Sequence, residues 1–367
     1  MYIKKIELNN FRNYIHLDMD FHKKVNILLG KNAQGKTNLI EAIYLTSIGK
    51  SFRTNKDHEM IGFDGEFARV KVSAEKNEEP LELELLIKKE GKEVKKEGYK
   101  LSKTSEMLDN IYIVVFSPED LRIVKDEPEK RRKFIDRELS QLKPVYYNNL
   151  SRYKKILQQR NALLKEKNVK EDSLKVWDIS LCEVGSKIIR QRKEFIEKIN
   201  LISKEIHKEI TNNKEILEII YEANIEYIEN MENQKDIYLK KLEKSWKNDI
   251  YKGNTSIGPH KDDLKLLVNG IDIRNYGSQG QQRTAALSLK LAEVKLIEEE
   301  KREKPILLLD DVLSELDSTR QKYLISSLKD LQIFITTTEI SEFLEKNLPE
   351  KNIYTVKDGK VKIRRHI

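Results

Sequence analysis

The chain has 367 residues, enough for two domains or for one domain with a large insertion. Charged residues make up 35% of it, the mean hydropathy is -0.64, and no apolar run approaches the roughly 18 residues of a membrane helix. A single cysteine, Cys182, excludes an internal disulfide and a cysteine-rich metal site. We therefore expect a cytoplasmic protein with no membrane partner.

Strand patterns dominate the N-terminal third of the chain. Alternation of apolar and polar residues predicts half-buried strands, and a short apolar run before residue 30 predicts a buried one. The expected strands are 2–8, 15–21, 25–29, 68–74, 81–87 and 98–101. The unbroken apolar run 111–116 is typical of a central strand. Ser117 then suits the cap of a helix that opens at Pro118.

Helical patterns replace the strands over residues 121–252. The expected helices are 129–142, 145–168, 173–211 and 233–250, with brief alternation at 216–227. The longest would run about 60 Å at 1.5 Å per residue. We interpret 121–252 as a mainly helical insertion domain.

Strands and helices alternate again from residue 253 onward. Expected strands at 264–268, 271–273, 305–309 and 331–337 alternate with helices at 280–301 and 318–329, and a last hairpin turns at Asp358-Gly359. This alternation predicts an α/β fold in which residues 1–120 and 253–367 form one head domain with a mixed sheet and a β-rich N-terminal lobe.

The strongest motif is G-x-x-x-x-G-K-[ST] at residues 30–37, here called the phosphate loop. It runs from a buried strand into a helix N-terminus, where free backbone N–H groups and the helix dipole suit a polyphosphate. Lys36 would reach the β- and γ-phosphates, and Thr37 would hold Mg²⁺. The expected ATP-binding residues of the loop are Gly30, Lys31, Asn32, Ala33, Gln34, Gly35, Lys36 and Thr37.

Two flanking segments are expected to lie beside the nucleotide. Arg12 and Asn13 occupy the turn between the first two strands. Ser51, Phe52 and Arg53 follow the phosphate-loop helix and supply an aromatic ring for base stacking and a cation.

The apolar run 306–309 delivers Asp310 to the C-terminal edge of the sheet, where it would bind Mg²⁺ with Thr37. Asp311 follows where this class of ATPase usually has a water-polarising Glu, one methylene longer. We expect Lys36, Asp310 and Asp311 to form the catalytic set.

Residues 278–281, here called the signature segment, precede a helix and form a second candidate anion site. It consists of Ser278, Gln279, Gly280 and Gln281. One chain does not need two γ-phosphate sensors, whereas two chains arranged head-to-tail do. The alternative is an ordinary capped helix.

The ordered set of phosphate loop, signature segment, Asp310-Asp311 and the segment containing Ser314 and Asp317 resembles ABC-type ATPases, specifically the heads of the SMC and Rad50 group. Asp310 lies 274 residues after Lys36, too far for a compact transporter ATPase and too near for a long-armed SMC protein. Three stretches resemble the RecF family of recombination proteins in particular. They are Pro118-Glu119-Asp120-Leu121 with 131–136, Gly258-Pro259-His260-Lys261-Asp262-Asp263-Leu264, and 310–317.

The sequence departs from the family pattern at several positions. Asp126-Glu127 replace Gly-Ser, Lys261 replaces Arg, no glutamine marks a Q-loop, and Thr336-Thr337-Thr338 stand in place of the switch histidine. Because fewer groups remain to position water and sense the γ-phosphate, we expect slow hydrolysis.

Net charge is +8 and is concentrated in residues 121–170, the basic block, which carries 15 Lys and Arg against 6 Asp and Glu. Such a block in a nucleotide-binding protein favours contact with nucleic acid; the alternative is a well-solvated helical surface. The candidate DNA contacts are Lys130, Arg131, Arg132, Lys133, Arg152, Lys154, Lys155 and Arg160.

The resulting hypothesis is an ATP-dependent DNA-repair protein. ATP with Mg²⁺ would close a homodimer on DNA, and slow, DNA-stimulated hydrolysis would release it. The resemblance implies duplex DNA or a junction of single and double strands, work with the RecO and RecR proteins, and recombinase loading at gaps. Two alternatives stay open: an SMC-like structural head without a DNA-loading role, and an ABC transporter subunit.

Overall fold

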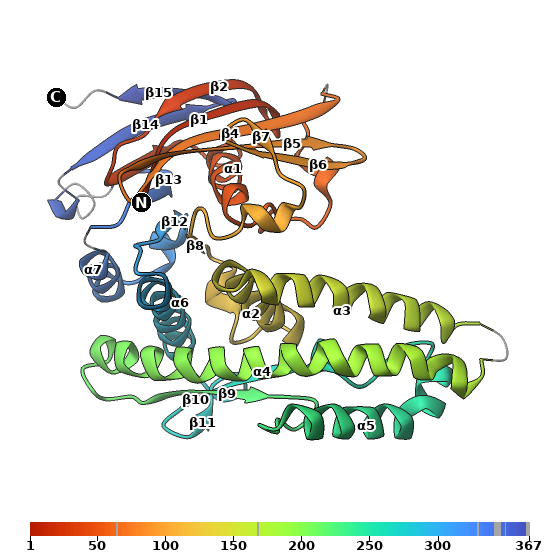
Figure 1. Ribbon diagram of the computed structural model, residues 1–367. Coiled ribbons are helices and arrows are strands. Elements are labelled where there is room, and N and C mark those ends of the chain that lie inside the picture. The colour runs from red at the N-terminus through yellow and green to blue at the C-terminus, as the bar shows by residue number, and fades with distance from the viewer. Residues whose placement is uncertain (64, 167–168, 329, 341–345, 349, 365–367) are drawn as a thin grey trace. The chain divides into compact units, whose positions relative to one another are not determined.

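The computed structural model describes residues 1–63, 65–166, 169–328, 330–340, 346–348 and 350–364 (Figure 1). The chain divides into two compact units, Met1–Leu121 with Glu293–Ile367, and Arg122–Ala292. The first division falls at Leu121, and the sequence predicted that the head ends at residue 120. The second corrects the expected return to the head at residue 253, because 253–292 belong to the second unit.

An antiparallel sheet forms the β-rich lobe of the first unit, with strand order β2-β1-β4-β5-β6-β7. Its strands are β1 (Tyr2–Phe11), β2 (Tyr14–Asp20), β4 (Phe67–Lys76), β5 (Glu79–Lys88), β6 (Gly91–Lys96) and β7 (Tyr99–Lys100). Alternate side chains such as Val70 and Val72 are fully buried while their neighbours are half-exposed, which is the pattern that predicted these strands. The short β6 was not predicted.

The second sheet of this unit has the order β15-β14-β3-β13-β12-β8. Its strands are β3 (Val25–Leu29), β8 (Ile113–Phe116), β12 (Ile306–Asp310), β13 (Ile333–Thr337), β14 (Lys351–Lys357) and β15 (Lys360–Arg364). All neighbours are parallel except the β14–β15 hairpin. β8 lies at an edge of this described sheet, so the expectation of a central strand was wrong. Its apolar run reports burial of both faces, which does not reveal whether a strand has one neighbour or two.

Helix α1 (Lys36–Ile48) contacts strands of both sheets, and Figure 1 shows it beneath the antiparallel sheet. Eleven of its residues are buried, so it is enclosed on more than the one side that its apolar pattern predicted. It ends at Gly49, whose φ of 67° gives the left-handed cap. Helix α7 (Ser318–Ser327) also belongs to this unit, and the expected last residue of that helix, 329, lies outside the described residues.

The helix expected to open at Pro118 does not form. The N–H and hydroxyl of Ser117 both donate to the Asp120 carboxylate, at 2.8 and 2.9 Å, and close a tight turn. A short 3-10 helix, η3 (Asp120–Arg122), follows, and the next α-helix begins at Pro128. The other short 3-10 helices are η1 (Asp57–Met60), η2 (Thr104–Met107), η4 (Pro259–Lys261) and η5 (Val312–Glu315).

The second unit is built on the 40-residue helix α4 (Glu171–Ile210). Helices α3 (Pro144–Leu163) and α5 (Met231–Lys252) run alongside it (Figure 1). Helix α2 (Pro128–Leu142) packs on α3, and α6 (Gln279–Lys301) begins here and ends in the first unit. The helices confirm the predicted helical character, although residues 167–168 of the expected 145–168 helix lie outside the described residues.

A three-stranded antiparallel sheet explains the corrected boundary. Its order is β11-β10-β9, from β9 (Leu217–Glu222), β10 (Asp263–Val268) and β11 (Ile271–Asp272). Because β10 pairs with β9 of the helical region and not with a head strand, the chain stays in the second unit well past residue 253. None of the described helices is both long enough and apolar enough to cross a membrane.

Candidate functional site

The phosphate loop connects β3 to α1, as its motif requires. Gly35 has a φ of 115°, and a side chain there would meet Asn13 at 2.8 Å. A Cβ on Gly30 would lie 2.4 Å from the carbonyl oxygen of Val356. Both glycines are therefore required by conformation or close approach.

Neighbouring segments hold the loop through its backbone. Asn13 Nδ2 donates to the carbonyl of Gln34 at 3.2 Å, and the N–H of Gly359 donates to the same oxygen at 3.1 Å. Tyr14 donates its hydroxyl to the carbonyl of Gly35 at 3.0 Å. The turn between β1 and β2 and the turn of the last hairpin thus fix the loop before any ligand binds.

Lys36 is almost completely buried at the start of α1. Its Nζ donates to the carbonyls of Gly30 and Lys31, at 2.6 and 3.2 Å. The ammonium therefore lies across the mouth of the loop, while Lys31, Asn32 and Ala33 are exposed at its tip. A phosphate in the loop would meet this cation together with the backbone N–H groups of the helix N-terminus.

Asp310 lies at the end of β12 and is 6% exposed. The hydroxyls of Thr37 and Thr336 donate to its Oδ1 at 3.0 and 2.8 Å. Burial raises the pKa of Asp310, and the two hydroxyls partly offset that shift. Thr37 and Asp310 thus bring a hydroxyl and a carboxylate oxygen together, as a hard cation such as Mg²⁺ prefers.

The oxygen donors fit Mg²⁺ only if phosphate and water complete its shell. Among the described residues, no group of three or more His, Cys, Asp or Glu could hold a metal ion. Mg²⁺ in nucleotide sites usually takes one or two protein ligands with substrate phosphates and waters, so Thr37 and Asp310 suffice.

Asp311 is half-buried and adopts a left-handed conformation, with a φ of 51°. Its N–H donates to Oγ1 of Thr336 at 2.8 Å. Thr336 therefore contacts both adjacent acids, a role that sequence reasoning missed. The pairing arises from the β12–β13 register, in which Asp310 lies opposite Thr336, and no local motif reports such a register.

A second missed residue is Glu41, a fully buried carboxylate on α1. Arg12 binds it through two nitrogens, at 2.9 and 2.8 Å, and Arg53 Nη1 lies 3.2 Å from its Oε2. Ser51 also donates to it. We call these four residues the Glu41 cluster. The available signal was an acid within the apolar run 39–45.

The remaining flanking residues also lie beside the loop. Asn38 donates to Oδ1 of Asn13 at 2.8 Å and accepts from Arg53 at 2.7 Å. The ring of Phe52 packs edge-on against Tyr44, with centroids 5.4 Å apart. The structure thus gathers Arg12, Asn13, Ser51 and Arg53 around the first turns of α1, at Asn38 and Glu41, and packs Phe52 further along the helix, against Tyr44.

The signature segment caps α6. Ser278 and Gln279 are exposed. Ser278 N donates to the side-chain oxygen of Gln281 at 3.0 Å, and Gln281 N donates to the Ser278 hydroxyl at 3.2 Å. This reciprocal pair is a capping box, so the segment does cap its helix, as the simpler alternative held, while an exposed hydroxyl stays at the helix N-terminus.

Ser314 and Asp317 belong to the segment that follows Asp311. The Ser314 hydroxyl donates to the carbonyl of Asp311 at 2.7 Å. Asp317 caps α7 by accepting from the N–H groups of Thr319 and Arg320, each at 3.0 Å. Any displacement of this segment would therefore act directly on the backbone of Asp311.

The candidate DNA contacts separate by burial. Arg132 is half-buried and donates to the carbonyl of Asp262 at 2.7 Å. The side chains that reach solvent are Lys130, Lys133, Arg152, Lys154 and Lys155.

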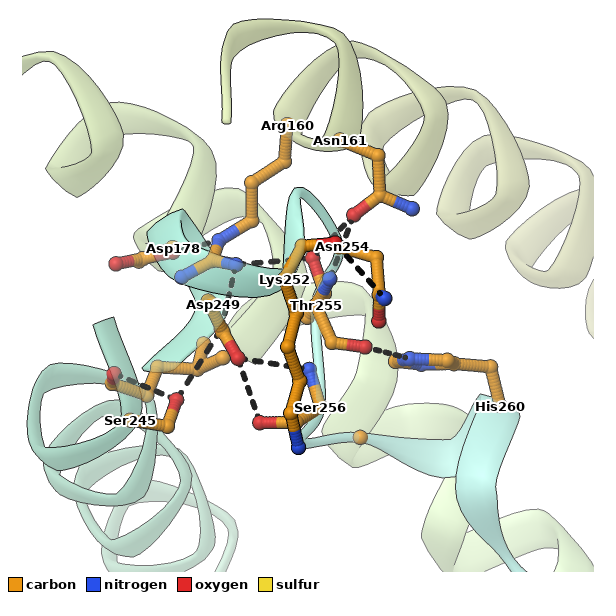
Figure 2. A network of polar contacts seen from close by, with 12 residues as sticks. Arg160, Asn161, Asp178, Ser245, Asp249, Lys252, Asn254, Thr255, Ser256 and His260 are labelled. Atoms are coloured by element: carbon orange, nitrogen blue, oxygen red, sulfur yellow. Dashed lines mark hydrogen bonds and ion pairs between the residues drawn. The ribbon is translucent and has the colours of Figure 1, made fainter. Parts of the chain in front are cut away.

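Two of the eight candidates are corrected. Arg131 is 1% exposed and binds both oxygens of Asp263, at 2.6 and 3.0 Å. Arg160 is fully buried, with Nε 2.5 Å from Asp178 and Nη1 2.9 Å from Asp249. Figure 2 shows its guanidinium enclosed between these acids. Both arginines are buried and paired with carboxylates, so neither presents its charge to a DNA phosphate in this structure.

Comparisons with known proteins agree along the whole chain. Residues 2–362 match the family described as RecF/RecN/SMC N terminal domain. The chain is 46% identical over 364 residues to the DNA replication and repair protein RecF of Alkaliphilus oremlandii, covering 98% of this chain and 100% of that protein. The RecF of Clostridioides difficile is 46% identical over 365 residues, covering 98% of each chain.

Solved structures give the same answer. A structure of the recombination mediator protein RecF with ATP, described as part of the RecFOR pathway, superposes with a TM-score of 0.91 at 40% identity. The alignment covers 99% of this chain and 98% of that one. The Smc head domain of Pyrococcus furiosus has a TM-score of 0.55 at 18% identity over 99% and 96% of the two chains, which supports the fold alone.

Proposed function

The chain belongs to the RecF family of DNA replication and repair proteins, which are ATPases of the SMC and ABC type, and we propose that it works as a clamp that ATP closes on DNA. The observation that carries this proposal is the convergence of Lys36, Thr37 and Asp310. A buried ammonium at the phosphate loop and a hydroxyl–carboxylate pair 3.0 Å apart are what a magnesium–triphosphate requires.

In the proposed site, residues 30–37 bind the phosphates and Thr37 and Asp310 hold Mg²⁺. Mg²⁺ would neutralise charge that develops on the phosphates. Asp311, whose N–H donates to the Thr336 hydroxyl, would orient the attacking water. Because Thr336, Thr337 and Thr338 stand where the family has its switch histidine and none of them can carry a positive charge, we expect slow hydrolysis that acts as a timer.

The signature segment of a second copy would complete the site. The phosphate loop lies in the first unit and the signature segment in the second. An exposed hydroxyl at a helix N-terminus suits the γ-phosphate of a partner chain. Two copies arranged head-to-tail would then share two nucleotides, and ATP would hold the dimer together.

We expect the dimer to bind DNA. The exposed cations of the basic block, among them Lys154 and Lys155, would contact phosphates without reading sequence. Family membership suggests a duplex or a junction of single and double strands. RecO and RecR are the expected protein partners, in support of recombinase loading at gaps.

Molecular mass in solution tests the clamp directly. With a non-hydrolysable ATP analogue we expect the mass of a dimer, and with ADP that of a monomer. Ser278→Arg should prevent the dimer, whereas Ser173→Arg, at an exposed serine in the first turn of α4, should not. Equal dimerisation of the wild type and Ser278→Arg would contradict the trans contact.

A second measurement separates the clamp from an SMC-like structural head. DNA binding across a salt series should strengthen with ATP, and its logarithmic slope should be about -0.9 for each phosphate neutralised. A flat slope with no effect of ATP would favour the structural head. Lys36→Arg should retain ATP and the dimer while losing hydrolysis.

A further inference from the structure

Glu215, in the connection between α4 and β9, joins two helices of the second unit. Its Oε1 accepts from Nε2 of Gln281, in the first turn of α6, at 2.9 Å. Its Oε2 lies 3.3 Å from Nε2 of His207, which is fully buried near the end of α4. Nδ1 of His207 lies in turn 3.1 Å from the hydroxyl of Ser288.

These four side chains fasten α6 at two points on one face. Gln281 and Ser288 are seven positions apart, which is about two helical turns. A helix held at one point can pivot, whereas a helix held at two points on the same face keeps its rotation. The last turn of α4 therefore sets the rotation of α6, which carries the signature segment, about its own axis.

Glu215 also decides which way the Gln281 amide faces. The amide oxygen accepts from Ser278 N at 3.0 Å, and the amide nitrogen donates to Glu215. A flipped amide would place its oxygen against the carboxylate and its NH₂ against another donor. The carboxylate therefore selects the orientation that closes the capping box and holds the Ser278 hydroxyl in place.

The interior of this arrangement is buried and polar. Ser288 donates to the carbonyl of Thr284, and Thr284 donates to the carbonyl of Gly280, each at 2.8 Å. Ser288 and His207 are fully buried and Thr284 is 2% exposed. A buried polar group without a hydrogen bond costs free energy. The network therefore favours the one arrangement of α6 in which these side chains are all bonded.

We propose that Glu215 is a positioning residue that holds the signature segment ready for the nucleotide of a partner chain, and that it couples this segment to α4. The inference rests on the proposed trans contact by Ser278. Glu215 touches no nucleotide in this scheme and acts only through Gln281. Its removal should therefore weaken the ATP-dependent dimer and leave nucleotide binding by the single chain unchanged.

The test uses the full chain and measures two quantities. The first is the dissociation constant of the dimer formed with a non-hydrolysable ATP analogue, by sedimentation. The second is the affinity of the monomeric chain for ATP, at protein concentrations below dimerisation. For Glu215→Ala we expect a dimer weakened about tenfold and an ATP affinity within about twofold of the wild type.

Matched variants separate positioning from general stability. Glu218→Ala makes the same substitution three residues away, on β9, where the backbone of Glu218 pairs with Leu267. This variant should leave the dimer intact. Glu215→Gln keeps an acceptor for Gln281 and should restore most of the dimerisation. If Glu215 acts through Gln281, the double variant Glu215→Ala with Gln281→Ala should be no weaker than Gln281→Ala alone.

The outcomes distinguish this inference from the proposal on which it rests. A wild-type dimer from Glu215→Ala, beside a failed dimer from Ser278→Arg, would overturn the role of Glu215 alone. Additive effects in the double variant would do the same. A wild-type dimer from Ser278→Arg would overturn the trans contact and this inference with it.

Discussion

The hydroxyl of Thr336 donates a 2.8 Å hydrogen bond to Oδ1 of Asp310 and accepts one of 2.8 Å from the N–H of Asp311. One threonine thus connects the proposed metal ligand to the proposed water-orienting acid. The parallel register of β12 and β13 places it there. This relationship makes Thr336 the residue on which the geometry of the two acids depends.

We expect Thr336→Val to make hydrolysis more sensitive to acid. Burial raises the pKa of Asp310 and the Thr336 hydroxyl lowers it, so losing that hydroxyl should raise the pKa further. Because Mg²⁺ needs the ionised carboxylate, the acid limb of the pH profile of ATP hydrolysis should move to higher pH. The hydrolysis rate on that limb should fall about tenfold.

The control for this prediction is the adjacent Thr337→Val. Thr337 donates its hydroxyl to the carbonyl of Glu339 at 2.7 Å and not to Asp310. Its profile should match that of the wild type. An acid limb that stays in place in Thr336→Val would contradict the proposed role of this hydroxyl.

Glu41→Gln should weaken both the fold and nucleotide binding. Glu41 is fully buried between Arg12 and Arg53, so the substitution leaves two cations without their counter-charge. We expect the free energy of unfolding to fall by about 3 kcal/mol, measured by urea denaturation, and ATP to bind more weakly. Glu59→Gln is the control, because the Glu59 side chain accepts from Thr54, outside the Glu41 cluster.

Arg160 and Lys155 should behave in opposite ways. Arg160→Ala leaves Asp178 and Asp249 without the cation that binds both, and we expect a loss of about 3–5 kcal/mol in the free energy of unfolding. Lys155→Gln should leave stability unchanged and lower the salt slope of DNA binding by about 0.9. A selective loss of DNA binding in a fully stable Arg160→Ala would contradict the structural role of Arg160.

His260 should make the fold sensitive to acid. Its Nδ1 lies 2.7 Å from the hydroxyl of Tyr153. Its Nε2 lies 2.9 Å from the carbonyl oxygen of Thr255 (Figure 2). Burial lowers the pKa of His260 from 6.5 to about 4. Below pH 6.5 the unfolded chain therefore takes up a proton more readily than the folded chain, and stability should fall as pH falls from 6.5 towards 4.

The size of that effect follows from the shift. The loss should approach roughly 3 kcal/mol across this window, and unfolding by urea at pH 7, 5.5 and 4.5 would measure it. His260→Gln removes the titrating group, so part of the pH dependence should disappear. An unchanged pH dependence in that variant would show that other groups carry the acid sensitivity.

Much of the site could be predicted from the sequence where its signal is local. The phosphate loop, the apolar strand before Asp310 and the capping segment at Ser278 are contiguous motifs, and their strand and helix neighbours follow from hydrophobic periodicity. The structure places Thr37 3.0 Å from Asp310 as the two motifs together required. The long helices were predicted for the same reason, since a periodic pattern over 40 residues tolerates errors at its ends.

By itself, the sequence determined the fold class, the phosphate-loop motif and the charge of the basic block, because each is written in neighbouring residues. Only the tertiary structure decided which cations are buried, that Thr336 and Glu41 belong to the site, and that residues 253–292 stay with the helices. Those outcomes depend on pairings such as Arg131 with Asp263, 132 positions apart. Burial of a charge is a property of everything packed around it, and composition shows the charge without its surroundings.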